Sequence, residues 1–195
     1  MTSVLVGDDG LARCAWAGRD SEYQRYHDEE WGTPLHGDRP LFEKLSLEGF
    51  QAGLSWITIL RRRPTFRAAF RDFDIDTVAA FDEADVERLM ADPGIIRNRL
   101  KVDATIANAR VTQALVRERP GALDELIWGF APSPRDHPPG SLAELPAVTA
   151  ESTALSSALQ KAGYRFVGPT TIYALMQSGG LVDDHVAGCW RSSFA

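Results

Sequence analysis

Residues 46–60 read SLEGFQAGLSWITIL and carry a single charge, that of Glu48, among large apolar side chains. A carboxylate in apolar surroundings is costly unless a partner is present, and such carboxylates concentrate at functional sites. Gly49 and Gly53 are four residues apart, so on a helix they would leave one bare strip that a flat partner can approach closely. The alternative is a buried helix whose glutamate reaches water or a backbone amide. The residue types alone leave both interpretations open.

The composition is that of a globular protein. Of its 195 residues, 44% are apolar and 25% are charged, which predicts one domain or two closely joined lobes. No apolar run reaches the roughly 18 residues of a membrane helix, and the N-terminus has no signal-peptide pattern, so we expect a cytoplasmic protein with no membrane partner. The net charge of −6 does not favour nucleic acid. Basic residues nevertheless cluster at 61–71 and 97–101, and a local basic face is what phosphate contacts require.

Apolar residues recur at helical spacing along most of the chain, and we find no alternating strand pattern. The sequence therefore predicts an all-α fold that follows a flexible tail over residues 1–13. Pro64 should end the helix that begins at Trp56. We expect helices over 20–31, 38–52, 56–62, 66–70, from 74 or 76, from 82, and over 96–119, 123–130, 152–162, 170–177 and 183–190.

Each of the two cysteines has a histidine nearby. Cys14 and His27 flank the start of the chain's first helix, while His185 and Cys189 are four residues apart, which on a helix places them on one face. Two sulfur and two nitrogen ligands suit a closed, four-coordinate Zn²⁺ of structural type. Such a site would join the two ends of the chain. The alternative is a set of buried histidines and inert thiols that never meet.

Aromatic residues surround His27 in the sequence. Together with Trp56 they are what stacking on a planar heterocycle needs, although an aromatic core is the ordinary explanation. The segment 163–171, GYRFVGPTT, offers backbone amides and a helix N-terminus that suit a phosphate, and a plain interhelical turn is its alternative. The aromatic residues are Trp16, Tyr23, Tyr26 and Trp31, and the candidate phosphate contacts in the second segment are Arg165, Gly168 and Thr170.

Five blocks of the sequence resemble successive signature blocks of the DNA-3-methyladenine glycosylase I family. They are CAWAGRDSEYQRYHDEEWGTP (14–34), LFEKLSLEGFQAGLSWITIL (41–60), ADPGIIRNRLKV (91–102), GYRFVGPTTIYALMQ (163–177) and LVDDHVAGC (181–189). The resemblance implies a helix-hairpin-helix DNA glycosylase fold, with the base pocket between two helical lobes and the termini joined by zinc. It implies a single glycosylase domain over 14–195, with the helix-hairpin-helix at about 152–177.

The resemblance also implies an activity. The protein would be a monomeric repair enzyme, without an organic cofactor, that flips 3-methyladenine out of alkylated double-stranded DNA. It would hydrolyse the N-glycosidic bond and leave an abasic site. On this basis Glu48 is the catalytic residue, and Leu54, beside Gly53, enters the gap left by the extruded base. The base pocket would hold Tyr26 and Trp56 with Tyr23, Trp16 and Trp31 in or near it, and the zinc ligands would be Cys14, His27, His185 and Cys189.

Asp183 is a further catalytic candidate. Relatives in the wider superfamily carry a catalytic Asp just after the second helix of the hairpin, whereas this branch often has Asn there; a surface role for Asp183 is the alternative. Two competing functions also stay open. One is a zinc-joined helical binding module without chemistry, and the other is a hydrolase with a catalytic zinc, which would need an open coordination position.

Overall fold

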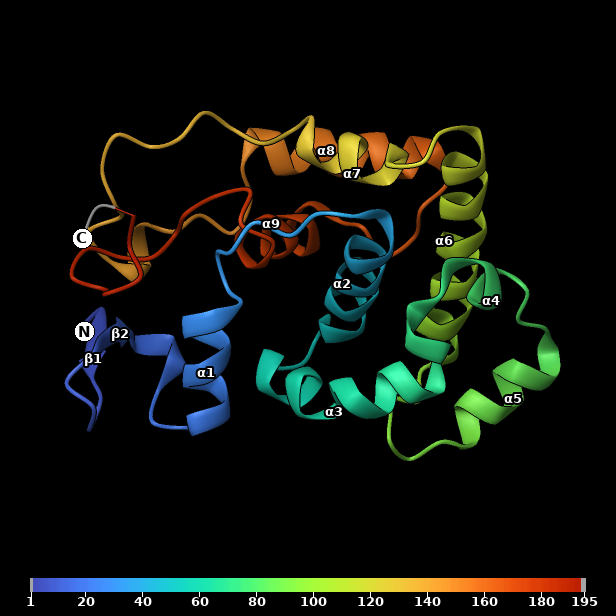
Figure 1. Cartoon of the computed structure of the whole chain (residues 1–195), viewed down its shortest axis with the longest axis horizontal. Helices are drawn as coiled ribbons and strands as arrows, with labels where there is room; N and C mark the ends of the chain where they lie inside the picture. The colour runs from blue at the N-terminus through green and yellow to red at the C-terminus, as the bar shows by residue number, and fades with distance from the viewer. Residues whose placement is uncertain (1, 194–195) are drawn as a thin grey trace.

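The structure, a computed structural model that describes residues 2–193, is mostly helical and is built around α2 (Asp38–Gln51). Figure 1 shows α2 near the middle of the molecule, between α1 and α6. None of the helices in the described residues has the length and apolar content to cross a bilayer. The other α-helices are α1 (Ser21–Glu29), α3 (Trp56–Ala69), α4 (Ile75–Ala79), α5 (Glu83–Ala91), α6 (Arg99–Glu118), α7 (Ala122–Trp128), α8 (Ala150–Ala162) and α9 (Pro169–Ser178).

Helix α2 is buried on nearly all sides, because α3, α6, α7 and α9 all pack against it. Leu41, Phe42 and Phe50 have no exposed surface. Burying a side chain of this size contributes about 1.5–3 kcal/mol. These contacts hold α2 in place even though the same helix also buries the charged side chains of Lys44 and Glu48.

The N-terminal segment corrects the prediction of a loose tail over residues 1–13 and of a chain without strands. Strand β1 (Val4–Val6) pairs antiparallel with β2 (Ala12–Cys14). Three residues in each strand are too few for an alternating pattern to be recognised. The backbone amide of Trp190 donates to the carbonyl of Ala12 at 2.8 Å, so this hairpin also holds the C-terminal segment. Residues 1, 194 and 195, which the predicted tail and domain include, lie outside the described residues.

Helix α3 runs through Pro64, so the prediction that this proline ends the helix is wrong. The separate helix expected over 66–70 is its continuation. Proline removes one helical hydrogen bond, that to the carbonyl four residues earlier. Beyond it, however, Phe66 and Phe70 are completely buried in the core, with ring centroids 6.2 Å apart. Their burial outweighs the lost bond and keeps the helix intact.

The C-terminal segment lacks the helix predicted over 183–190, which forms turns instead. Gly188 has φ +83, a left-handed conformation that a helix does not allow. The amide of Cys189 bonds the carbonyl of Val186 at 3.0 Å, and that of Ala187 bonds Pro139 at 2.8 Å. The segment is thus held by the hairpin and by the loop before α8.

The end of α9 lies against the loop that follows α1. The amide of Gly32 donates to the carbonyl of Gln177 at 3.2 Å, and that of Leu35 donates to Gly179 at 3.0 Å. Gly180 has φ +73, and a Cβ there would lie 2.5 Å from the backbone of Thr33, so only glycine allows this approach. These contacts place the last turn of α9 beside α1 and α2.

Replacing Pro64 with alanine tests how much stability α3 loses through the hydrogen bond that this proline cannot make. We expect Pro64→Ala to raise the free energy of unfolding by about 1–3 kcal/mol, because the new amide can bond the carbonyl of Leu60. Chemical denaturation measures the change. Pro40→Ala is the matched control, since Pro40 lies in the first turn of α2, where the amide has no partner within the helix. Equal effects in the two variants would contradict this explanation.

Candidate functional site

A cavity of about 200 Å³ lies where α1, α2, α3 and α9 meet, and Glu48 is part of its wall. Its lining is aromatic on one side and polar on the other. The residues that line it are Trp16, Tyr23, Tyr26, Trp31, Glu48, Gln51, Trp56, Leu145, Ala174, Gln177 and Ser178. All five aromatic residues singled out from the sequence therefore line the same cavity as Glu48, and we call it the aromatic cavity.

The aromatic side chains contact one another as a continuous group. The ring of Trp16 lies 5.0 Å from that of Tyr23 and 5.1 Å from that of Trp31, both in edge-to-face geometry. The ring of Tyr26 lies 5.5 Å from that of Trp56, which comes from α3. Edge-to-face and offset contacts of this kind hold rings rigidly. The cavity thus presents several fixed aromatic surfaces to a planar ligand.

Glu48 is only 3% exposed, and its carboxylate has two neighbours. The hydroxyl of Ser178 donates to Oε1 at 2.8 Å, and the ammonium Nζ of Lys44 lies 3.7 Å from the same oxygen. Burial raises the pKa of Glu48 above its ordinary value, and Lys44 and Ser178 oppose that rise. A carboxylate in this position favours positive charge or a hydrogen-bond donor placed in the cavity.

Lys44 is the partner that the sequence analysis missed. It lies one helical turn before Glu48, just outside the stretch 46–60, and i to i+4 spacing was the available signal. Its ammonium also donates to the hydroxyl of Tyr26 at 2.9 Å. Ser178 and Gln177 were missed as well, because nothing in the sequence places the end of α9 beside α2.

A shallow groove of about 190 Å³ extends from the aromatic cavity, with which it shares Glu48, Gln51 and Ala174. The residues that line only the groove are Ala52, Gly53, Leu54, Thr170 and Thr171. Leu54 is 42% exposed. Three of the candidate DNA contacts, Gly53, Leu54 and Thr170, therefore lie together at the edge of the cavity.

The bare strip expected from Gly49 and Gly53 does not form. Helix α2 ends at Gln51, and Gly53 lies in the following turn with φ +84. Gly49 instead faces Phe166, whose Cβ would lie 3.6 Å from a Cβ at position 49. The glycine thus allows the segment between α8 and α9 to pack onto α2.

The remaining candidates in the 163–171 segment, Arg165 and Gly168, lie outside the groove lining. The side chain of Asn108 holds the segment, because it accepts from the amide of Arg165 at 2.8 Å and donates to its carbonyl at 3.0 Å. The Arg165 side chain is exposed. Gly168 is the N-cap of α9. The backbone amides in the first turn of that helix have no hydrogen-bond partner within the helix.

The basic clusters are largely paired within the protein. Arg63 forms an ion pair with Glu30, Arg67 with Glu43 at 2.8 Å, and Arg99 with Glu83 at 2.6 Å. Lys101 donates to the carbonyls of Phe50 and Ala52, at 2.8 and 2.7 Å, and so holds the end of α2 next to the groove. These basic side chains therefore make stabilising contacts within the protein.

Asp183 does not line the aromatic cavity. Its carboxylate accepts from the amide of His185 at 3.0 Å and from the amide and hydroxyl of Ser193, at 2.9 and 2.5 Å. Both oxygens are thereby used to shape the C-terminal segment. This geometry matches a structural role better than a catalytic one.

Cys14, His27, His185 and Cys189 come together as the sequence predicted, although His185 and Cys189 do so without a helix. All four are buried, and their ligand atoms lie within 4.8 Å of one another. The Sγ of Cys189 lies 3.4 Å from Nε2 of His27 and 3.5 Å from Nδ1 of His185, which is itself 3.8 Å from Sγ of Cys14. Tetrahedral ligands around Zn²⁺ would be separated by roughly 3.3–3.8 Å, so the donor set fits such an ion.

The cluster has a second set of contacts that orients its ligands. Nδ1 of His27 lies 2.8 Å from Asp28, whose carboxylate also accepts from Arg13 at 2.6 Å. Nε2 of His185 lies 3.2 Å from the carbonyl of Trp31. Metal-bound histidines use their second nitrogen in this way. The residues present could therefore hold a metal ion with no further side chain.

The chain matches the family model of the methyladenine glycosylases over residues 16–192. It is 47% identical over 180 residues to DNA-3-methyladenine glycosylase 1 of Escherichia coli (strain K12), covering 92% of this chain and 96% of that protein. A crystal structure of 3-methyladenine DNA glycosylase I superposes with a TM-score of 0.88 at 46% identity, covering 92% of this chain and 99% of that one. The chain belongs to the methyladenine glycosylase family. It is therefore an enzyme, a hydrolase of N-glycosyl bonds.

Family membership excludes the alternative of a binding module without chemistry. A further relative of this glycosylase, a variant of a 3-methyladenine DNA glycosylase I solved in complex with 3-methyladenine, superposes with a TM-score of 0.84 at 32% identity, covering 91% of this chain and 95% of that one. The overall backbone is thus shared with a protein solved in complex with 3-methyladenine.

Proposed function

We propose that this glycosylase removes 3-methyladenine from alkylated double-stranded DNA. The nucleotide flips into the aromatic cavity, its N-glycosidic bond is hydrolysed, and an abasic site remains. The observation that carries the proposal is the buried carboxylate of Glu48 in the wall of that cavity. The names of the relatives point to the same base.

The chemistry follows from the charge of the damaged base. Methylation at N3 makes the adenine cationic in DNA, and it leaves as a neutral molecule, so the leaving group needs little protonation. The enzyme must mainly extrude the nucleotide, at a cost of a few kcal/mol, and recognise it among normal adenines. Glu48 accepts a hydrogen bond from the base and favours its positive charge, while Trp56 stacks on its face. Tyr26 orients the edge of the base, and water then attacks the sugar.

The groove beside the cavity supplies the DNA contacts in this proposal. Leu54 is exposed at the end of α2, where it fills the gap that the extruded base leaves. Helices α8 and α9 with residues 163–168 between them act as the helix-hairpin-helix, and the exposed Thr170 in the first turn of α9 contacts a phosphate. Arg165 and Gly168 contribute to the same backbone contact.

We expect Glu48→Gln to lower the rate of 3-methyladenine release by about 100-fold, because it removes the charge that faces the cationic base. Release from methylated duplex DNA, with the liberated base identified by chromatography and the uncatalysed loss subtracted, measures this rate. Glu87→Gln is the control: it removes an exposed carboxylate on α5, outside the aromatic cavity. Activity of Glu48→Gln within a few-fold of wild type would remove Glu48 from its role.

We expect the rate of base release to fall as the pH is lowered. The fall should begin at a higher pH than it would if Glu48 had the pKa of an ordinary glutamate. Burial raises the pKa of Glu48, and the carboxylate that favours the cationic base is lost when the pH drops through that raised value. An unperturbed glutamate titrates at about 4.3. A pH profile of kcat/KM for base release, which reports groups of the free enzyme, measures the effect. The fall in acid should persist in Glu87→Gln and disappear from the residual activity of Glu48→Gln.

We further propose that the Cys14, His27, His185 and Cys189 cluster holds one structural Zn²⁺. Its thiolates and imidazoles suit this ion, and four protein ligands leave no position for a reacting water. Bound there, the ion supplies folding free energy and joins the β1–β2 hairpin to the C-terminal segment. The competing hydrolase with a catalytic zinc has no support from a closed set of ligands.

Metal analysis should find about one zinc per chain in wild type and a clear loss in Cys189→Ala. The variant should also melt at a lower temperature, since each kcal/mol of lost stability lowers Tm by roughly 2–4 °C in a chain of this size. His137→Ala, which changes an exposed histidine outside the cluster, should keep both properties. A chelated protein that stays folded but stops releasing base would instead indicate a catalytic metal.

A further inference from the structure

Lys44 is a buried cation placed against the carboxylate that is proposed to bind the base. Its side chain comes from α2, its residue is 8% exposed, and Nζ lies 3.7 Å from Oε1 of Glu48. The same ammonium lies 4.3 Å from the ring centroid of Trp56 and 5.0 Å from that of Tyr26. Lys44 thus already makes, within the protein, the carboxylate and aromatic contacts that a cationic base would make.

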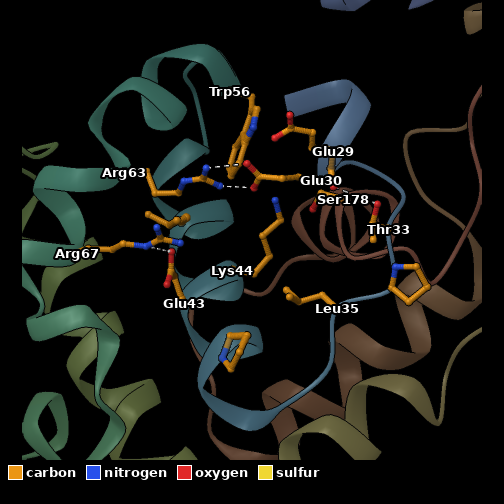
Figure 2. Close-up of a pocket in the computed structure, with 13 residues that line it drawn as sticks. Glu29, Glu30, Thr33, Leu35, Glu43, Lys44, Trp56, Arg63, Arg67 and Ser178 are labelled. Atoms are coloured by element: carbon orange, nitrogen blue, oxygen red, sulfur yellow. Dashed lines mark hydrogen bonds and ion pairs between the residues drawn. The ribbon is translucent and has the colours of Figure 1, made fainter. Parts of the chain in front are cut away.

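A second cavity of about 220 Å³ lies on the other side of Lys44. Lys44 itself lines this second cavity, while Trp56 and Ser178 line both cavities. Figure 2 shows its side chain rising from α2 with the ammonium directed toward Glu30 and Trp56. We call this space the acidic cavity, after the three carboxylates that line it: Glu29, Glu30 and Glu43. Arg63 and Arg67 line it as well and pair with Glu30 and Glu43.

Charges of both signs surround Lys44. On α2 it faces Glu43 and Glu48. From α1 it faces the hydroxyl of Tyr26, and Glu30 directly follows that helix. From α3 it faces Arg63, whose guanidinium is paired with Glu30. Burial lowers the pKa of Lys44, and Glu48 is the strongest influence that opposes this change. An ammonium that leaves Glu48 would still lie near the carboxylates of the acidic cavity, of which Glu30 and Glu43 are shared with Arg63 and Arg67.

A cationic base and the Lys44 ammonium cannot share Glu48 without repulsion. Two positive charges a few ångströms apart in a low-dielectric site repel strongly. A methylated adenine brings a charge that replaces the ammonium at the carboxylate, whereas a normal adenine is neutral and offers no such replacement. The same geometry would therefore favour the damaged base over the undamaged one.

We propose that Lys44 is a displaceable counter-ion of Glu48, which neutralises the carboxylate in the free enzyme and yields it to the cationic base by moving toward the acidic cavity. The inference rests on the proposed function for the identity of the base. Lys44 is a positioning residue in this scheme, because it holds Glu48 ready and makes no contact with the reacting atoms.

Titration of Glu48 in the free protein tests the counter-ion role without any substrate. Carbon-13 NMR of labelled glutamate carboxyls follows it, and the Glu48 signal is the one that Glu48→Gln removes. In Lys44→Met, which keeps the apolar stem, we expect the midpoint to move to higher pH, because the neighbouring charge is gone. Lys44→Arg should keep it near the wild-type value. Arg67→Met is the matched control, since it removes a cation that lines the acidic cavity and pairs with Glu43.

Base release tests the displacement. In Lys44→Met, the pH at which 3-methyladenine release falls in acid should rise together with the Glu48 midpoint. The release rate on the plateau at higher pH should stay at or above the wild-type rate. Thermal melting checks that this variant is folded, and Lys44→Gln replaces it if not. An unchanged midpoint would overturn the counter-ion role, and a plateau more than tenfold below wild type would show that Lys44 acts in the reaction itself. If wild type releases no 3-methyladenine, the proposed function fails, and the titration still decides the counter-ion role.

Discussion

The burial of one carboxylate in the central helix is the constraint around which the molecule is arranged. An ionised side chain inside a protein costs several kcal/mol unless charge or hydrogen bonds compensate it. For Glu48 the compensation comes from Lys44 on the same helix and from Ser178 at the end of α9. The end of α9 reaches that place because Gly180 lets it approach the loop after α1. A local electrostatic need is thus met by contacts between elements far apart in sequence.

The metal-ligand cluster and the aromatic cavity are separate sites with a common wall. The ring of Trp31 lies 4.6 Å from that of His185, and the ring of Trp16 lies 5.3 Å from that of His27. Both tryptophans also line the aromatic cavity. Anything that fixes the two histidines therefore fixes one side of the cavity. Through this contact the cluster would support the proposed chemistry by rigidity, without taking part in it.

Much of the helical fold could be predicted, because residues at or next to a helix end largely determine where the helix begins and ends. Asp20, Asp74 and Asp82 each cap the helix that follows, where the sequence predicted a start. Helices α6 and α8 follow the caps Asn98 and Thr149, within three residues of their predicted starts at 96 and 152. The errors occur where distant contacts override a local signal. Pro64 does not break α3, since buried phenylalanines follow it, and the β1–β2 hairpin is held by a segment nearly 180 residues away.

For the site, the sequence by itself determined the chemistry that was available: one acidic side chain in an apolar stretch, a group of aromatic residues, and two cysteines with two histidines at ligand-like spacing. These properties belong to residue types and short spacings, so they are visible without coordinates. Only the tertiary structure decided that these groups converge, that Lys44 and Ser178 share the carboxylate of Glu48, and that Asp183 stays outside the cavity. The physical reason is that a buried charge is stabilised by whichever partners the packing of helices brings within reach, and sequence distance does not measure that reach.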